Sequence, residues 1–281
     1  MTGIGGLLVV GATGIGTSSA EVHSRLVSLD TAQPSHESSD SGPACPSLRF
    51  FGVRGSGEHS GYGQTIGSLE QDLARKVRGM SPTAINYTAL DVPLPTEQEI
   101  ALARAGATGE LAAAAEYGHT LAAYRNAYQN SVTTGLAELL AQYNAYERKC
   151  PGHPVMFAGY SQGADVTTDA YDLLPQAKKN HVILVNFGDP HFDAGERWVD
   201  HGTYNSDLQA ILVHWWGNPA HSFAQSDSGR VGTWCAAGDP VCNWSWPNIL
   251  TGVLVHLYTY ASKYTAPAAS WAYQAWRNLP G

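Results

Sequence analysis

The chain has 281 residues, of which 43% are hydrophobic and 14% are charged, and its formal net charge at pH 7 is −8. The hydrophobic content is enough for a sizeable core, while the charged content lies below the about 25% of an average soluble domain. The charges form no long runs of one sign, which argues against a nucleic-acid partner or a polybasic membrane contact, because phosphate binding needs clustered Lys and Arg.

The N-terminal segment differs in composition from the rest of the chain. An apolar run at residues 4–10 is followed by small residues up to Ala20, so we interpret residues 1–20 as a secretory signal that lacks the usual basic start. Residues 21–44 are rich in Ser and predict a disordered leader. No segment reaches the roughly 20 apolar residues that a membrane span needs, and we expect residues 45–281 to form one domain.

The same N-terminal stretch offers a competing interpretation. Residues 7–16, LLVVGATGIG, resemble a strand that runs into the glycine-rich turn of a dinucleotide fold. Such a turn must open a helix, with an acidic residue about 20 positions further on. Asp30 lies near that distance, but the Ser-rich segment before it has no helical apolar spacing. We therefore disfavour a nicotinamide cofactor.

From Ser47 onward, strand and helix patterns alternate. The predicted strands are 48–53, 84–92, 154–158, 181–187, 210–216 and 231–236. The predicted helices are 64–80, two or more within 96–149 broken near Gly106, Gly109 and Gly118, one from 162 to 174, and most of 248–278. This alternation, without internal repeats or a linker, predicts an α/β protein with a three-layer α/β/α hydrolase-like fold and a mainly parallel central sheet.

The segment around Ser161 carries the strongest chemical signal. Residues 159–163, GYSQG, fit the GxSxG nucleophile elbow, in which a serine on a sharp turn needs small neighbours. A bare GxSxG is weak evidence, but this one stands between a buried strand pattern and a helix pattern. The context favours a nucleophilic serine.

A serine nucleophile needs a histidine base and an acid that holds the imidazole, and on this fold the chain order is serine, acid, histidine. Six histidines follow Ser161, but only His256 follows Asp239. Asp189, at the end of a buried strand pattern, and Asp239, between two cysteines, are both candidate acids. A lone histidine in an apolar stretch is normally a core residue, but the order of the triad favours His256 as the base.

Acyl transfer also needs hydrogen-bond donors for the tetrahedral oxyanion. The N–H of Gln162, directly after the nucleophile, is one candidate, and Ser56 in the early Arg-Gly-Ser-Gly turn is the other. Taken alone, this turn is better explained as a glycine-rich loop with Arg54 in a salt bridge.

The four cysteines form no CxxC pair, which argues against a zinc or redox motif. An even number suits two disulfides in an oxidising compartment, with three connectivities open and the short loop between Cys235 and Cys242 the simplest pair.

Together these residues resemble the cutinase family of the α/β-hydrolase superfamily, in its actinobacterial type. The matching segments are FFGVRGSGE (50–58), Cys150-Pro151, AGYSQG (158–163), CAAGDPVC (235–242) and His256. The resemblance implies a secreted serine esterase with the triad Ser161, Asp239 and His256, the oxyanion donors Ser56 and Gln162, and the disulfides Cys45–Cys150 and Cys235–Cys242. It implies no metal or cofactor and decides against Asp189 as the acid.

The chain departs from the compact fungal pattern in two places, near 96–128 and between 187 and 235, and these segments are candidates to cover the cleft. Aromatic residues flank the acid segment and can line an acyl pocket, stack on sugars or simply pack in the core: Trp215, Trp216, Trp234, Trp244 and Trp246. We expect a monomer that acts on fatty-acyl esters of lipids or acylated polymers. The alternatives are an acetylxylan-type esterase and a non-catalytic surface or binding protein on the same fold.

Overall fold

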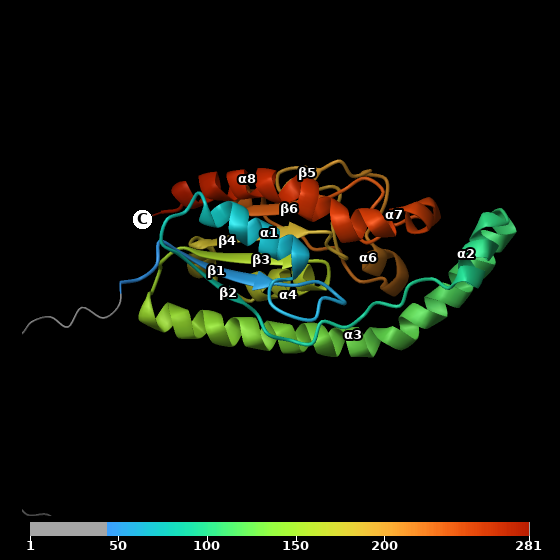
Figure 1. Ribbon diagram of the computed structural model, residues 1–281, viewed down its shortest axis with the longest axis horizontal. Coiled ribbons are helices and arrows are strands. Elements are labelled where there is room, and N and C mark those ends of the chain that lie inside the picture. The colour runs from blue at the N-terminus through green and yellow to red at the C-terminus, as the bar shows by residue number, and fades with distance from the viewer. Residues whose placement is uncertain (1–43, 281) are drawn as a thin grey trace, which may run out of the picture. The chain divides into compact units, whose positions relative to one another are not determined.

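The computed structural model describes residues 44–280, which fold around one parallel β-sheet (Figure 1). The six strands lie in the order β2-β1-β3-β4-β6-β5, and every pair is parallel. Their bounds are β1 Leu48–Val53, β2 Met80–Ala84, β3 Val155–Tyr160, β4 Val182–Phe187, β5 Asp200–Gly202 and β6 Val231–Cys235. The predicted α/β fold with a central parallel sheet is therefore confirmed.

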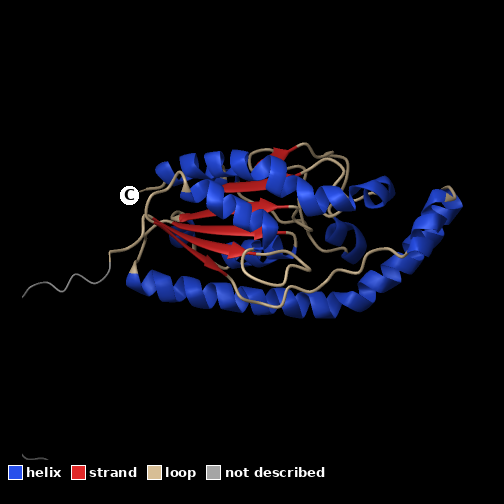
Figure 2. Ribbon diagram, viewed as in Figure 1, coloured by secondary structure: helices blue, strands red, loops and turns tan. Residues whose placement is uncertain are grey.

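Helices cover both faces of the sheet, giving three layers (Figure 2). Their bounds are α1 Gly63–Ala74, α2 Glu97–Arg104, α3 Ala107–Lys149, α4 Gln162–Asp172, α5 Gln176–Lys179, α6 Ile211–Trp216, α7 Trp246–Thr259 and α8 Thr265–Arg277. A 3₁₀ turn spans Gln225–Asp227, and a π-helical turn, Tyr260–Tyr264, joins α7 to α8.

The central strands bury both of their faces because successive side chains point to opposite sides of a strand. In β3, Val155 and Phe157 pack in the core under α3 and α4. Met156 and Ala158 pack in the second core, under α1 and α8. This double burial explains the continuous apolar runs of β3 and β4. The carboxyl ends of the strands point toward α6 and α7, where the candidate site lies (Figure 1).

Helix α3 is one continuous helix of 43 residues, so the predicted breaks at Gly109 and Gly118 were wrong. Both glycines serve close contacts instead. A Cβ on Gly118 would lie 2.9 Å from the Trp215 ring of α6, and one on Gly109 would lie 2.0 Å from the carbonyl oxygen of Leu102 in α2. The break near Gly106 is real, and α2 packs against α3 there.

Two predicted strands were also wrong. Residues 210–216 form α6, because a short apolar run does not distinguish a strand from a buried helix. The strand expected over 84–92 is instead β2, which ends at Ala84. Ile85 and Tyr87 are apolar because they are buried in the core beyond the strand.

The described residues contain two disulfides, Cys45–Cys150 and Cys235–Cys242, and no free cysteine. Within residues 44–280, no helix combines the length and the apolarity that crossing a bilayer requires. The predicted secretory signal, nearly all of the leader and the glycine-rich turn near Gly11 fall in residues 1–43, outside the described residues.

Candidate active site

Ser161 lies at the sharp turn between β3 and α4. Its backbone has φ 53° and ψ −121°, and it is the one non-glycine residue with positive φ among residues 44–280. Such a conformation costs about 1–3 kcal/mol and is kept where the surroundings enforce it. A Cβ on Gly159 would lie 2.4 Å from the Gly163 oxygen, and a Cβ on Gly163 2.3 Å from the Val53 oxygen. The two glycines thus allow the strand and the helix to meet tightly at the serine.

Ser161, His256 and Asp239 form a hydrogen-bonded chain. His256 Nε2 lies 3.0 Å from Ser161 Oγ, and His256 Nδ1 lies 2.9 Å from Asp239 Oδ2. Ser161 is 6% exposed, His256 9% and Asp239 0%. A buried chain of this kind can accept the serine proton on the imidazole while the carboxylate holds the ring and stabilises its charged form.

His256 is fixed by Tyr160, the residue before the serine. The Tyr160 ring stacks on the imidazole with 5.0 Å between ring centroids, and the Tyr160 hydroxyl donates to the His256 carbonyl oxygen at 2.7 Å. Burial, more than any other factor, raises the pKa of Tyr160 well above its usual value, so this hydroxyl remains a neutral donor.

Asp239 lies in the short loop that the Cys235–Cys242 disulfide closes after β6. Its Oδ1 accepts from the Val241 N–H at 2.7 Å, and its Oδ2 accepts from the Tyr260 hydroxyl as well as contacting His256. Gly188 packs against the pair, because a Cβ there would lie 2.8 Å from the imidazole. Both oxygens of the Asp239 carboxylate are therefore held by hydrogen bonds.

Asp189, the other candidate acid, lies in a different group of side chains. Its Oδ2 lies 2.8 Å from His221 Nδ1, and its Oδ1 accepts from the His191 N–H at 2.8 Å. The structure pairs His256 with Asp239 and pairs Asp189 with His221.

The turn that carries Ser56 lies beside Ser161, and both residues line the same two pockets. The Ser56 hydroxyl is buried and makes no hydrogen bond to any residue of 44–280. Gln162 begins α4, and its side-chain oxygen accepts from the Leu90 N–H at 3.2 Å. The first N–H groups of a helix are unpaired within it and face incoming negative charge.

Glu58 braces this turn. One carboxylate oxygen accepts from the Gly55 N–H at 2.8 Å and the other from the Gln64 N–H at 2.6 Å. Burial raises the pKa of Glu58, and the two N–H donors oppose that effect. Among residues 44–280, Arg54 has no salt-bridge partner, contrary to that sequence interpretation. Its guanidinium donates to the carbonyls of Glu58, Ile85 and Tyr87.

Two neighbouring cavities with shared lining residues flank Ser161. The larger, about 190 Å³, is lined mostly by apolar side chains together with Ser161 and His256, and the smaller is about 40 Å³. Ile211 of α6, Val92 and Val241 line both. Tyr117 and Leu121 of α3 contribute to the walls, so both segments that depart from the compact pattern border the cavities.

The tryptophans divide between two environments. Trp234 packs against Phe187, His201 and Trp271 in the core under α8. Trp215, Trp244 and Trp246 pack on one another, and Tyr117 stacks on Trp244 with an interplanar angle of 14°. Much of their aromatic surface is thus used in packing.

The sequence interpretation missed Tyr160, Tyr260 and Glu58. Tyr260 follows His256 by four residues on the same helical segment, a spacing that places two side chains on one face and so could have indicated it. Glu58 depends on how the chain folds back on Gly55 and Gln64, and no spacing rule indicates that.

Comparisons with known proteins agree with this arrangement. The sequence model of the cutinase family matches residues 98–276, well over half of the chain. The chain is 21% identical over 214 residues to Acetylxylan esterase 2 of Talaromyces purpureogenus, which covers 71% of this chain and 76% of that protein. It is 25% identical over 146 residues to Carboxylesterase Culp1 of Mycobacterium bovis, covering 52% of this chain and 58% of that one.

Solved structures share the fold at low identity. A crystal structure of acetylxylan esterase at 0.90 Å resolution aligns with a TM-score of 0.59 and 21% identity over 83% of this chain and all of that chain. A cutinase-like protein from Cryptococcus sp. aligns with a TM-score of 0.58 and 18% identity over 83% of this chain and 96% of that chain. With its parallel sheet, its nucleophile elbow and its family match, this chain belongs to the cutinase family and is a carboxylic ester hydrolase.

Proposed function

We propose that Ser161 is the nucleophile of this esterase, His256 its general base and Asp239 the acid that orients the imidazole. The observation that carries the proposal is the chain of contacts from Ser161 Oγ to His256 Nε2 and from His256 Nδ1 to Asp239 Oδ2. Ser161 Oγ attacks the ester carbonyl while His256 takes the serine proton. Collapse of the tetrahedral intermediate releases the alcohol, which takes that proton from His256.

Hydrolysis of the acyl-enzyme repeats these steps with water as the attacking group. His256 removes a proton from water, the hydroxide oxygen bonds to the acyl carbon, and Ser161 leaves with the proton held on His256. The Gln162 N–H and Ser56 are the proposed donors to the oxyanion in both steps. The buried, unpaired Ser56 hydroxyl beside Ser161 supports its role, because it has a donor to offer there.

The cavity beside Ser161 supports an acyl chain longer than acetyl as the substrate. About 10–15 Å³ of such space holds one water molecule, so about 190 Å³ leaves room well beyond one methyl group. Most of the lining is apolar, as an acyl chain requires.

Exposed apolar side chains next to the cavity also support a fatty-acyl substrate. Leu94 is 58% exposed and Leu257 42% exposed, and both line the cavity. Leu254 and Tyr258 lie three residues before and one residue after Leu257 on α7 and are also exposed. This apolar rim suits a lipid-like ester, so we propose fatty-acyl esters as the substrate class. The two disulfides suit an oxidising compartment, and we propose that the protein is secreted.

An acetyl ester on a carbohydrate is the second candidate. Its support is the similarity to acetylxylan esterases and a cavity of about 460 Å³ beside Trp215, Trp244 and Trp246. The mutual packing of these rings leaves less free aromatic surface for a sugar. A panel of p-nitrophenyl esters separates the candidates: fatty-acyl specificity requires kcat/KM to rise beyond acetate, and acetyl specificity requires it to fall.

The nucleophile is tested by Ser161→Ala, with Ser270→Ala on α8, an exposed serine, as the matched control. Ser161→Ala should abolish ester turnover and labelling by a fluorophosphonate probe, while Ser270→Ala should retain both. Turnover retained by Ser161→Ala would contradict the assignment. Failure of the parent protein to label would favour the non-catalytic binding protein.

A further inference from the structure

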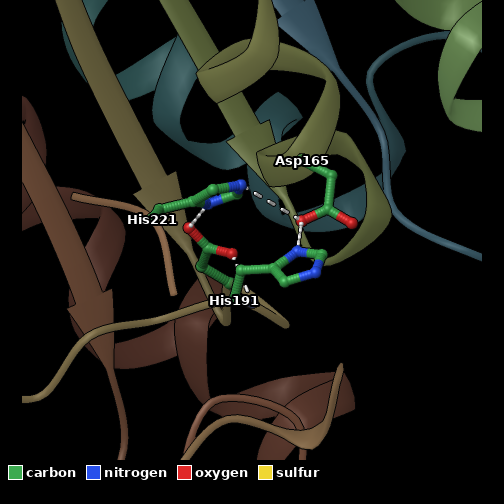
Figure 3. A group of neighbouring side chains, drawn as sticks. Asp165, His191 and His221 are labelled. Atoms are coloured by element: carbon green, nitrogen blue, oxygen red, sulfur yellow. Dashed lines mark hydrogen bonds and ion pairs between the residues drawn. The ribbon is translucent and has the colours of Figure 1, made fainter. Parts of the chain in front are cut away.

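A second group of ionisable side chains, distinct from Ser161, His256 and Asp239, lies at the first turn of α4. Asp165 of α4, His191 of the loop after β4 and His221 of the loop before the 3₁₀ turn point toward one another (Figure 3). With Asp189 they offer four ligand atoms that all lie within 4.8 Å of one another. Asp165 and Asp189 are buried, while His191 and His221 are partly exposed.

The Asp165 carboxylate faces both imidazoles. Its Oδ1 lies 2.7 Å from His191 Nδ1 and 3.9 Å from His221 Nε2. Its other oxygen accepts from the Tyr128 hydroxyl, which leaves Oδ1 directed at the histidines. The distance of 3.9 Å is too long for a hydrogen bond. It is roughly 0.6 Å longer than the about 3.3 Å that separates two ligand atoms of a tetrahedral zinc site, so Asp165 Oδ1 and His221 Nε2 would have to approach only slightly to share an ion.

Asp189 contacts the ring nitrogen of His221 that faces away from Asp165. It lies 2.8 Å from His221 Nδ1, so the Nδ1–H of that ring donates to a carboxylate while Nε2 faces Asp165. A carboxylate behind the ring is the usual partner of a metal-bound histidine, because it fixes the ring and its tautomer. The pairing of Asp189 with His221 thus directs Nε2 toward Asp165, where it becomes a ligand atom once it gives up its proton.

We propose that Asp165 Oδ1, His191 Nδ1 and His221 Nε2 bind a divalent transition metal ion of the zinc class, with Asp189 orienting His221. Two histidines and one carboxylate form a ligand set that suits zinc. A cavity of about 820 Å³ reaches the same side chains and gives an ion a route to them. Asp169 and Asp172 also line this cavity and make its surroundings acidic, which favours entry of a cation.

Binding also requires the ring proton of His191 to move. In the described arrangement Arg125 donates to Asn218 Oδ1 at 3.0 Å, and Asn218 Nδ2 lies 3.1 Å from His191 Nε2. This assigns the ring proton of His191 to Nδ1, where it is shared with Asp165. A metal ion on Nδ1 displaces that proton to Nε2, and the Asn218 amide must then turn its oxygen toward the ring. Asp165 Oδ1 and His191 Nδ1, now 2.7 Å apart, must also move to the ligand spacing of a tetrahedral site, about 3.3 Å.

The ion would join three segments that are far apart in the sequence: the first turn of α4, the loop after β4 and the loop at 217–224. Its expected effect is stabilisation of this side of the fold, since a ligand that binds only the folded chain raises the free energy of unfolding.

The experiment is a calorimetric titration of the purified, EDTA-treated full chain with Zn²⁺, together with thermal unfolding with and without the ion. Saturable binding at one site and a rise in Tm are expected. Asp165→Asn and His221→Gln should each remove that binding, and Asp189→Asn should weaken it about 10–100-fold. Asp172→Asn is the matched control, because Asp172 lines the same cavity but pairs with Lys179 at 3.5 Å.

Asn218→Asp keeps the test decisive if a ligand variant does not fold. Its carboxylate accepts from both Arg125 and the His191 Nε2–H, so no amide has to turn and Zn²⁺ should bind more tightly than to the parent. Absence of saturable binding to the parent overturns the proposal. So does equal affinity of the parent, Asp165→Asn and His221→Gln, which would place the ion on other histidines, and so does an unchanged affinity in Asn218→Asp.

Discussion

The Tyr260 hydroxyl donates to Asp239 Oδ2, the same oxygen that contacts His256 Nδ1. It also accepts from the Ala236 N–H at 3.1 Å. Burial, and then the charge of Asp239, raises the pKa of Tyr260 well above its usual value, so the hydroxyl is a permanent donor. Tyr260 therefore competes with the imidazole for one carboxylate oxygen and lowers the negative charge that His256 experiences.

Replacing Tyr260 by Phe tests this relationship. With one donor removed, the carboxylate stabilises a protonated His256 more strongly, so the acidic limb of the kcat/KM profile should move to higher pH. The Ala236 N–H also loses its partner, which should lower the free energy of unfolding by about 1–3 kcal/mol. Tyr264→Phe is the control, since that hydroxyl lies 3.0 Å from Thr203 Oγ1. A pH profile unchanged in Tyr260→Phe would show that the hydroxyl has only a structural role.

Removal of the two disulfides should affect stability and catalysis to different degrees. Cys45–Cys150 joins residues 105 apart, and a loop of that length predicts a loss of about 5 kcal/mol of stability. It lies at the end of α3 remote from Ser161, because Cys150 directly follows that helix and precedes the amino end of β3. The Cys45→Ser/Cys150→Ser variant should therefore unfold more readily while kcat is retained at low temperature.

Cys235–Cys242 closes a loop of a few residues around Asp239. The chain-entropy estimate is smaller, about 2.5 kcal/mol, but the loop holds the carboxylate that orients His256. Cys235→Ser/Cys242→Ser should therefore lower kcat more than the first pair does while lowering Tm less. Thermal unfolding and ester kinetics on both double variants measure the comparison, and the reverse order of effects would refute it.

The parts of the site that were predictable are those encoded in one continuous stretch. The elbow at Ser161 follows from a buried strand, small neighbours and a helix in sequence, and all of these are local. The order of serine, acid and histidine restricted the base to His256, but the choice between Asp189 and Asp239 depended on family resemblance. The adjacent parallel strands β4 and β6 are each followed by a loop that carries an aspartate, Asp189 and Asp239 respectively. Spacing alone does not say which of the two loops faces His256.

The parts that were not predictable depend on distant segments. Asp165, His191 and His221 come from three separate elements with no metal-binding spacing, so only the fold brings them together. Helix α6 was misassigned for the same reason: the run ILVHWW is apolar because α6 packs against α3 and contributes Ile211 and Leu212 to the core, whichever backbone conformation it has. Gly118 was read as a helix breaker although its lack of a side chain admits Trp215.

Ile211 should control the acyl chain length, because it lines both cavities beside Ser161. Ile211→Ala merges and enlarges them and should raise kcat/KM for long-chain relative to short-chain p-nitrophenyl esters. Ile211→Phe fills the same space and should shift the ratio toward acetate. Ile→Ala in a core costs about 2–5 kcal/mol, so the ratio of two substrates on one enzyme is measured rather than absolute activity. Ratios that move together in both variants would exclude these cavities as the acyl site.

Asp200 should make the stability of the fold depend on pH. Burial, aided by the charges of Glu196 and Asp193, raises its pKa from 3.8 to about 7, against the opposing hydrogen bonds from Thr233 and Tyr204. Because the folded state prefers the protonated carboxyl, its contribution to stability is full below about pH 4 and is lost as the pH rises to about 7.

Asp200→Asn removes this titration, since an amide stays neutral at every pH. The free energy of unfolding of the variant relative to the parent should therefore increase from pH 4 to pH 8, as the parent alone acquires a half-buried charge. Urea unfolding at several pH values measures the difference, with the exposed Asp207→Asn as the control. A difference between Asp200→Asn and the parent that stays constant across this range would show that the carboxyl is charged throughout, and the burial of Asp200 at the β5 edge would then carry no energetic cost.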